Sequence, residues 1–368
     1  MGTMLKLDKV TKIYPGTDFR AVDELSFELE EGEICILVGP SGCGKTTAMK
    51  MINRLHPITS GKIFIDGQDV SGLDTIQLRR RIGYVIQNVG LFPNMTIAEN
   101  ISVIPNLLKW DKKRVKERVH SLLEIVNLPA EEYKDRYPRE LSGGQQQRIG
   151  VARGMAGDPP IMLMDEPFGA IDPINRDHLQ NEFLKIQEKV KKTIVFVTHD
   201  IDEAIKMGDK ICLLKDGKLI QFASPENMLT HPKNDFVRDF VGGDRTIKRL
   251  NLFSISKVMR EDPPSVQDTA GIEEARGRLS EAGTGYLVVL DENGRLAGLV
   301  SDEDLGKNGD KVADVVQATN AYLDGTSSLK DALSEIFTHD VGFLVVVDGD
   351  GKVTGWLDTN DIKKALKD

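Results

Sequence analysis

Residues 34–46 read Ile34-Cys35-Ile36-Leu37-Val38-Gly39-Pro40-Ser41-Gly42-Cys43-Gly44-Lys45-Thr46. The five apolar residues at the start predict a buried strand, and the eight that follow fit the pattern G-x-x-x-x-G-K-[S/T], a glycine-rich turn that leads into a helix. In such a turn backbone N–H groups converge on phosphate oxygens, and the helix directs its positive end at them. Lys45 can then reach the β- and γ-phosphates, and Thr46 can offer its hydroxyl to Mg²⁺. The alternative is a chance match in a glycine-rich turn, but the preceding strand favours a nucleoside triphosphate site.

The length of 368 residues indicates two or more domains, each large enough to bury a core. Apolar runs such as Tyr286–Leu290 are far shorter than the ~20 residues that span a bilayer, and no long apolar stretch of the signal-peptide kind stands at the N-terminus. The three cysteines, Cys35, Cys43 and Cys212, show no C-x-x-C spacing, which favours a reducing compartment. We expect a cytoplasmic protein that reaches a membrane only through a partner.

Charge divides the chain into two different parts. Residues 1–251 contain 36 Lys and Arg against 35 Asp and Glu, whereas residues 252–368 contain 12 against 22, so the acidic excess lies in the C-terminal part. A protein that binds DNA or RNA usually carries a basic stripe instead. The charge pattern therefore argues against nucleic acid as a partner.

The C-terminal part repeats itself. Thr284–Leu305 aligns without gaps on Val341–Ile362, a shift of 57 residues, and each copy predicts helix, strand, turn, strand and helix. The turns, at residues 291–294 and 348–351, have the composition of a hairpin. Because a glycine pair and the charged run Arg245–Arg249 precede the repeats, we expect a domain boundary near Gly243.

Three further motifs in the first part are ambiguous when each is taken alone. Tyr14 follows a strand-like run and can offer its ring to a base, although an ordinary strand-end tyrosine is the more common case. Gln87 also follows a strand-like run, where a parallel sheet would deliver it to the edge at which ligands bind. Ser142–Gln145 places two glycines at the start of a probable helix, which suits either an anion or a plain N-cap at Ser142.

Two strand ends carry catalytic types of side chain. Asp165 and Glu166 follow the apolar run Ile161–Met164, so one carboxylate can hold Mg²⁺ and the next can activate a water. His199 follows the apolar run that begins at Ile194. An isolated histidine is usually structural, and only its company here favours a role in catalysis.

Together these motifs resemble those of the nucleotide-binding subunit of ABC transporters, over residues 4–240. The resemblance implies an α/β fold: a P-loop ABC ATPase domain with a mixed sheet core, an antiparallel β subdomain and a helical subdomain. It implies ATP and Mg²⁺ as cofactors. The implied ATP-binding residues are Tyr14, Gly39, Pro40, Ser41, Gly42, Cys43, Gly44, Lys45, Thr46 and Thr47. The implied catalytic residues are Glu166, His199 and Gln87, and the implied Mg²⁺ ligands are Thr46, Gln87 and Asp165. The implied signature motif is Ser142, Gly143, Gly144 and Gln145, and the implied D-loop aspartate is Asp172.

In this family two subunits pack head to tail, and the signature motif of one closes over the ATP bound by the other. The resemblance thus implies a homodimer with two shared sites, in which one chain alone hydrolyses ATP poorly. The segment Leu91–Asn100 is similar to the one through which importer ATPases contact their permease.

The C-terminal repeats resemble tandem CBS domains, an α+β module. Such pairs often bind adenosine-type ligands through a Ser/Thr-x-x-Asp motif, which Ser301 and Asp304 fit, whereas Asp358 and Asp361 depart from it. Helix N-caps would explain both pairs equally well. We expect an ABC domain at residues 1–244, a linker at 245–252, and CBS domains at 253–308 and 309–368.

An ABC ATPase followed by two CBS domains looks like the ATP-binding subunit of importers for glycine betaine, carnitine or choline. The resemblance implies integral-membrane permease subunits, an extracytoplasmic solute-binding protein and a place at the cytoplasmic face of a bacterial membrane. It also implies regulation by ionic strength, a nucleotide or a cyclic dinucleotide at the CBS module.

Three alternatives to this reading stay open. The chain could serve an importer of another small solute. A non-transport ABC ATPase would share the motifs, but usually carries a coiled-coil insertion or a second cassette. A regulatory protein that binds ATP without hydrolysis is disfavoured by Glu166 and His199.

Overall fold

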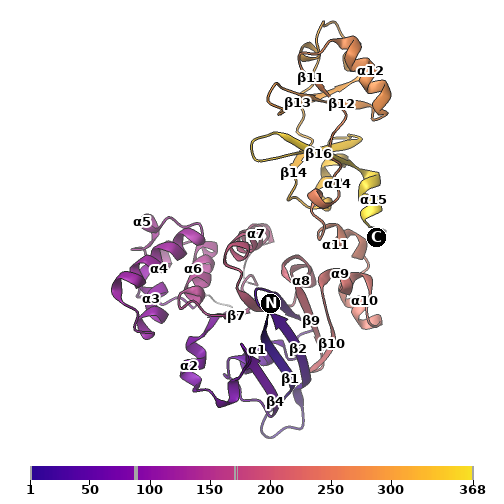
Figure 1. The fold of residues 1–368 in the computed structure, drawn as a ribbon. Helices are drawn as coiled ribbons and strands as arrows, with labels where there is room; N and C mark the ends of the chain where they lie inside the picture. The colour runs from indigo at the N-terminus through magenta and orange to yellow at the C-terminus, as the bar shows by residue number, and fades with distance from the viewer. Residues whose placement is uncertain (1, 87–89, 170, 172, 367–368) are drawn as a thin grey trace. The chain divides into compact units, whose positions relative to one another are not determined.

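The computed structural model describes residues 2–86, 90–169, 171 and 173–366 (Figure 1). It divides into two compact units, residues 1–243 and 244–368. Among the described helices, none has the length and apolar character needed to cross a membrane.

A mixed six-stranded sheet forms the centre of the first unit. Its strand order is β10-β9-β3-β8-β7-β6, and all neighbours are parallel except β9 and β10. The strands are β3 (Ile34–Val38), β6 (Ile82–Val85), β7 (Ile161–Asp165), β8 (Thr193–Val197), β9 (Lys210–Lys215) and β10 (Lys218–Ala223). Every residue of β3 and β8 is buried, which is why these strands read as continuous apolar runs. The parallel arrangement brings the carboxyl ends of β3, β7 and β8 to one edge.

A second, antiparallel sheet packs on the same core. Its order is β2-β1-β4-β5, with β1 (Thr3–Ile13), β2 (Arg20–Glu30), β4 (Ser60–Ile65) and β5 (Gln68–Asp69). Burial alternates along β2, so that Leu25, Phe27 and Leu29 enter the core while their neighbours stay exposed. Helix α1 (Lys45–Ile52) contributes Met49 and Ile52 to the same cluster.

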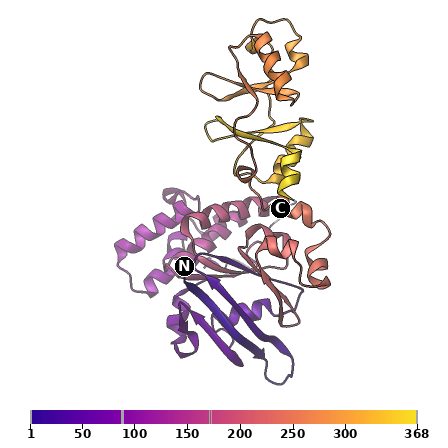
Figure 2. The same ribbon diagram turned by 45° about the vertical axis from the view of Figure 1, so that its right-hand side comes forward.

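Helices complete the first unit, and both views show α3 to α6 gathered as a separate group beside the sheets (Figure 1 and Figure 2). The N-caps Thr96, Asp111 and Ser142 start three of these helices, α3, α4 and α6, as capping side chains do. The group comprises α3 (Ile97–Leu107), α4 (Lys112–Ile125), α5 (Ala130–Tyr133) and α6 (Gly143–Met155). The others are α2 (Thr75–Arg80), α7 (Pro173–Val190), α8 (Ile201–Met207), α9 (Pro225–Thr230) and α10 (Asp235–Val241), with 3₁₀ turns η1 (Val70–Gly72) and η2 (Pro138–Glu140). The predicted mixed sheet, antiparallel subdomain and helical subdomain are confirmed.

The second unit contains the two repeats. The first has β11 (Ser265–Gln267), α12 (Ile272–Ala282), β12 (Tyr286–Leu290), β13 (Leu296–Ser301) and α13 (Asp302–Leu305). The second has β14 (Tyr322–Asp324), α14 (Leu329–Thr338), β15 (Phe343–Val347), β16 (Val353–Asp358) and α15 (Thr359–Ala365). Around them lie α11 (Arg245–Leu250), η3 (Ile255–Lys257) and η4 (Val312–Asp314). The predicted order of elements is confirmed, and each repeat gains a short leading strand that pairs in parallel with the next one.

The segment before each repeat packs on the other repeat. Ile255 lies in the core of the second repeat, and the backbone of Arg260 pairs with Trp356 of β16. Reciprocally, Val312 lies in the core of the first repeat, and Gln317 pairs with Leu299 of β13. The two backbone pairs are related by the 57-residue shift of the repeat. The packing thus crosses between the two segments expected as separate CBS domains.

Part of the expected linker is helical. Within residues 245–252, α11 buries Leu250 in the core of the second repeat, and Arg249 donates a hydrogen bond to the carbonyl of Leu366 at 2.7 Å. These residues therefore pack as part of the second unit.

Candidate ATP site

The glycines of the loop between β3 and α1 have distinct structural reasons. A Cβ atom on Gly39 would lie 2.1 Å from the carbonyl oxygen of Leu214, and one on Gly44 would lie 2.3 Å from that of Ala21. Gly42 has a φ of +78° and no neighbour within 4 Å of its Cβ position. Two glycines thus let the loop pack on the sheets, and the third supplies a left-handed turn that faces open space.

Lys45 lies inside this loop. Its side chain is buried, and Nζ donates to the carbonyl oxygens of Gly39 at 2.7 Å and Pro40 at 3.1 Å. No side chain caps the start of α1 at Gly44. The first N–H groups of the helix and the ammonium group therefore give this loop the positive character that binds phosphate.

Thr46 and Asp165 bring two oxygen ligands together at the sheet edge. The Thr46 hydroxyl donates to Oδ1 of Asp165 at 3.2 Å. Burial raises the pKa of Asp165, and the hydrogen bond from Thr46 and the nearby Lys50 partly offset this rise. Hydroxyl and carboxylate oxygens suit Mg²⁺, which also takes phosphate and water ligands, so this pair fits the ion. Gln87, the third expected ligand, lies outside the described residues.

Glu166 and His199 meet at the ends of β7 and β8. Glu166 has a φ of +44°, and its N–H donates to the carbonyl of Val197 at 2.9 Å. His199 Nδ1 lies 3.4 Å from Glu166 Oε1. A left-handed conformation at a non-glycine residue costs about 1–3 kcal/mol, so the surrounding contacts must hold it in place. Beside the pair lies a pocket of about 10 Å³, room for a single water molecule.

A second layer of side chains, which the sequence analysis did not identify, lines this pocket. Glu203 in α8 is buried, and its Oε1 accepts a hydrogen bond from Gln180 of α7 at 3.0 Å. Burial raises the pKa of Glu203. Arg176 of α7 also lines the pocket. A signal for Glu203 was available, because a carboxylate next to the apolar pair Ala204-Ile205 in a short helix is unusual on a buried face.

Tyr14 lies next to the phosphate loop. Its hydroxyl is 3.5 Å from Thr47 Oγ1, and its half-buried ring meets His56 edge to face at a centroid distance of 5.8 Å. Lys12 Nζ lies 5.0 Å from the centre of the ring. The tyrosine is thus placed on the loop side of β1, where a base can reach it.

Ser142–Gln145 forms the first turn of α6. The Ser142 hydroxyl accepts from the N–H of Gln145 at 3.3 Å, and the Gln145 side chain accepts from the N–H of Ser142 at 2.9 Å. Ser142 and Gly143 are exposed at the surface of the helical subdomain. The N-cap reading and the exposed N–H groups are therefore compatible. Asp172 lies outside the described residues.

The two Ser/Asp-x-x-Asp pairs of the second unit are both helix N-caps. In the first repeat, Asp304 accepts from the Ser301 hydroxyl at 2.6 Å and pairs with Lys307 at 2.6 Å. In the second, Asp358 and Asp361 cap α15.

Arg260 contacts both aspartates of the second pair, Asp358 and Asp361. Its guanidinium lies 2.7 Å from the carboxylates of both Asp358 and Asp361 and 3.7 Å from the centre of the Trp356 ring. The residue that corresponds to Arg260 at the 57-residue shift is Gln317, whose backbone pairs with Leu299 of the first repeat. The two positions therefore differ chemically, and a ligand role for Ser301 and Asp304 stays a prediction.

Comparisons with known proteins agree with this geometry. The family model for ABC transporters matches residues 22–169, and that for CBS domains matches residues 255–307 and 312–368. The chain is 45% identical over 356 residues to the osmoprotectant import ATP-binding protein of Salmonella typhimurium, covering 96% of this chain and 93% of the relative. It is 46% identical, with the same coverage, to the glycine betaine/carnitine/choline transport ATP-binding protein of Bacillus subtilis. A dimeric ATP-binding cassette in a post-hydrolysis state with ADP and Pi superposes with a TM-score of 0.53 at 35% identity, covering 60% of this chain and 99% of the other.

Proposed function

The chain belongs to the family of ABC transporter ATP-binding proteins that carry a C-terminal CBS pair, and we propose that it powers import of a quaternary amine osmoprotectant through a separate permease. The chemistry it performs is ATP hydrolysis. The observation that carries the ATPase part of the proposal is the meeting of two pairs, Thr46 with Asp165 and Glu166 with His199, at the edge next to the phosphate loop.

The roles of the site residues follow from this geometry. Lys45 and the uncapped N–H groups of α1 bind the β- and γ-phosphates. Glu166 accepts a proton from the attacking water, and His199 orients that carboxylate and contacts the γ-phosphate. Thr46 and Asp165 would hold a Mg²⁺ ion, which would supply positive charge to the phosphates. Tyr14 stacks on the adenine. Gln87 and Asp172, which lie outside the described residues, are included in the proposed site because of their positions in the family motifs.

Two copies share each ATP in the proposed assembly. Ser142 and its neighbours lie exposed on the helical subdomain, where they can serve the nucleotide of a second chain. The similar cassette solved with ADP and Pi is a dimer, which supports this arrangement.

The segment Leu91–Asn100 is the proposed contact with the permease. Phe92 and Met95 are exposed there, which gives an apolar surface for a partner. Arg153 of α6 donates to the carbonyl of Gly90 at 2.7 Å, and its guanidinium lies 5.7 Å from the centre of the Phe92 ring. The contact ties this segment to the helix whose first turn is the signature motif.

The solute and the regulation are proposed from the relatives and from the module. Relatives named for osmoprotectants, and for glycine betaine, carnitine and choline, align over nearly the whole chain, CBS pair included. The proposed ATPase domain is residues 1–244, and the proposed CBS domains, 253–308 and 309–368, regulate it, with Ser301 and Asp304 as the ligand position. The division after Gly243 and the CBS matches at 255–307 and 312–368 lie close to these bounds and support them. The protein then works at the cytoplasmic face of the membrane.

Uptake into vesicles tests the proposal. The chain is co-purified with its permease, reconstituted with ATP inside, and supplied with solute-binding protein and labelled glycine betaine, carnitine or choline. We expect ATP-dependent uptake of at least one, and none when Glu166 is replaced by Gln. Uptake of an unrelated solute alone would favour an importer of another class, and ATPase activity without a co-purifying membrane protein would favour a non-transport ATPase.

A further inference from the structure

Helix α7 supports the signature motif directly. A Cβ atom on Gly144 would lie 3.2 Å from Cδ1 of Leu179, so the first turn of α6 packs closely against this side chain of α7. Leu179 is buried. The position of the signature residues therefore depends on how the helical subdomain sits on α7.

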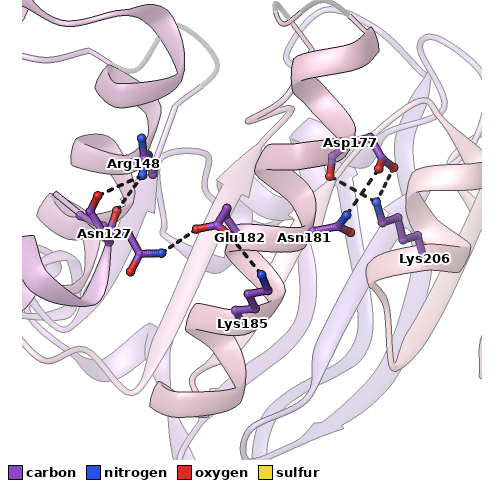
Figure 3. Close-up of polar contacts among 8 residues, drawn as sticks. Asn127, Arg148, Asp177, Asn181, Glu182, Lys185 and Lys206 are labelled. Atoms are coloured by element: carbon purple, nitrogen blue, oxygen red, sulfur yellow. Dashed lines mark hydrogen bonds and ion pairs between the residues drawn. The ribbon is translucent and has the colours of Figure 1, made fainter. Parts of the chain in front are cut away.

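Hydrogen bonds also join the helical subdomain to α7 (Figure 3). Asn127, just beyond the end of α4, donates from Nδ2 to Oε2 of Glu182 in α7 at 2.6 Å. Arg148 of α6 donates to the carbonyls of Val126 at 3.2 Å and Asn127 at 3.3 Å. The signature helix, the end of α4 and α7 are thus connected by three hydrogen bonds.

The other face of α7 contacts α8, the helix that follows His199. Gln180 donates to Glu203 of α8. Lys206 of α8 pairs with Asp177 at 2.5 Å (Figure 3). α8 begins two residues after His199. Helix α7 therefore lies between the γ-phosphate side of a protomer's own site and the signature motif that it offers to its partner.

We propose that Asn127 and Glu182 are positioning residues: their hydrogen bond fixes the angle of the helical subdomain on α7 and so places Ser142 and its neighbours for the ATP of the partner subunit. The inference rests on the proposed function, since only a shared site gives the signature motif a role in trans. It adds residues far from the phosphates to the determinants of turnover.

The location of the hydrogen bond between Asn127 and Glu182 explains why it sets the angle of the helical subdomain on α7. A second contact, between Arg118 of α4 and Asp158 at 3.5 Å, lies where the chain passes from α6 to β7. Asn127 is nine residues further along the chain than Arg118, roughly 14 Å at the rise of a helix. With one contact near the connection and one remote from it, loss of the remote contact frees the subdomain to tilt.

Three variants isolate the hydrogen bond. Asn127→Asp places a carboxylate against Glu182, and aspartate tolerates the left-handed backbone at this position, where φ is +55°. Glu182→Gln keeps an acceptor for Asn127, so its effect should be small. The double variant restores the bond with donor and acceptor exchanged. Lys185→Ala is the matched control, because Lys185 pairs with the same Glu182 at 3.4 Å but does not bridge to the helical subdomain.

Dimers of two differently tagged full-length copies supply the test. One copy carries Lys45→Ala and offers its signature motif to the other, which binds ATP. We expect Asn127→Asp in the Lys45→Ala copy to lower hydrolysis at the surviving site about tenfold, the worth of a hydrogen bond to a charged group. In the ATP-binding copy the same change should stay within about twofold. The double variant should recover most of the loss, and Lys185→Ala should have no effect in either copy.

Other outcomes separate the role of this hydrogen bond from the shared site. An equal loss from Asn127→Asp in both copies, or no loss in either, overturns the positioning role. Ser142→Arg placed in the same two copies checks the shared site independently: it should abolish activity only in the Lys45→Ala copy. If it does not, the proposed two-subunit site fails, whatever Asn127 does.

Discussion

The Glu166 carboxylate and the His199 imidazole come from adjacent strands and meet beside a water-sized pocket. The strained backbone at Glu166 is held by its hydrogen bond to Val197, so β8 positions the carboxylate as well as the histidine. The two side chains therefore depend on the same pair of strands for their alignment.

Glu166→Gln should preserve ATP affinity and reduce turnover by about two to three orders of magnitude, because the amide keeps the shape but cannot accept a proton. The ATP-bound dimer should then accumulate. Size-exclusion chromatography with ATP and Mg²⁺ should show a dimer for this variant and mostly monomer for Lys45→Ala. Equal elution of the two would exclude Glu166 as the base.

Glu203→Gln should stabilise the first unit at high pH. Burial raises the pKa of the Glu203 carboxyl in the folded state above its value in the unfolded chain. The folded state therefore loses stability as pH rises through the interval between these two pKa values, and the loss remains at higher pH. The glutamine carries no such penalty and still accepts from Gln180. Urea unfolding followed by Trp110 fluorescence, in a Trp356→Phe background, should give a higher midpoint for the variant at pH 8 and a smaller gap at pH 5. A gap independent of pH would contradict this account.

At the scale of elements, the second unit depends on strands that accept a neighbour from the other repeat. Gly355 of β16 faces the backbone of Arg260, and a Cβ there would lie 2.7 Å from its carbonyl oxygen and 2.9 Å from Sδ of Met259. The segment around Arg260 therefore leaves no room for a side chain at position 355.

Gly355→Ala should therefore detach the segment around Arg260 and raise hydrogen exchange in β16 of the full chain. Gly349→Ala is the control, since no atom lies within 4 Å of its Cβ position. Similar exchange rates in the two variants would show that the backbone pairing of Arg260 with Trp356 does not hold the segment.

The features that could be predicted from the sequence are those whose residues follow one another along the chain. The phosphate loop and the strand-end carboxylates each occupy one short run, so their local order was enough. The partners of those residues are far along the chain: Gly39 packs on Leu214, and Arg260 pairs with Asp358. The packing of the segment before each repeat on the other repeat, and the contacts of α7, arise from such distant contacts, which no local pattern encodes.

At the scale of the whole molecule, the chain joins an ATPase to a module with its own cores and a net charge of −10 over residues 252–368. The catalytic motifs end at His199, and the division between units follows Gly243. We therefore expect the module to be separable from the proposed catalytic residues.

Removal of residues 245–368 should leave basal ATPase activity largely intact and abolish regulation. Uptake in vesicles with the full transporter is measured against internal salt, which shortens the Debye length from ~30 Å at 0.01 M to ~8 Å at 0.15 M, and then against adenine nucleotides and cyclic dinucleotides. If the shortened transporter keeps the salt threshold and every nucleotide response of the intact one, the module is structural.

The central claim is that each ATP is hydrolysed between two chains, and mixing tests it most directly. Dimers that combine Ser142→Arg in one copy with Lys45→Ala in the other retain one site with both halves intact, whereas either variant alone retains none. The ATPase rate of the purified mixed dimer should recover to about half that of the unmodified dimer, while each variant homodimer stays near background. A mixed dimer no more active than the two homodimers would contradict the shared site.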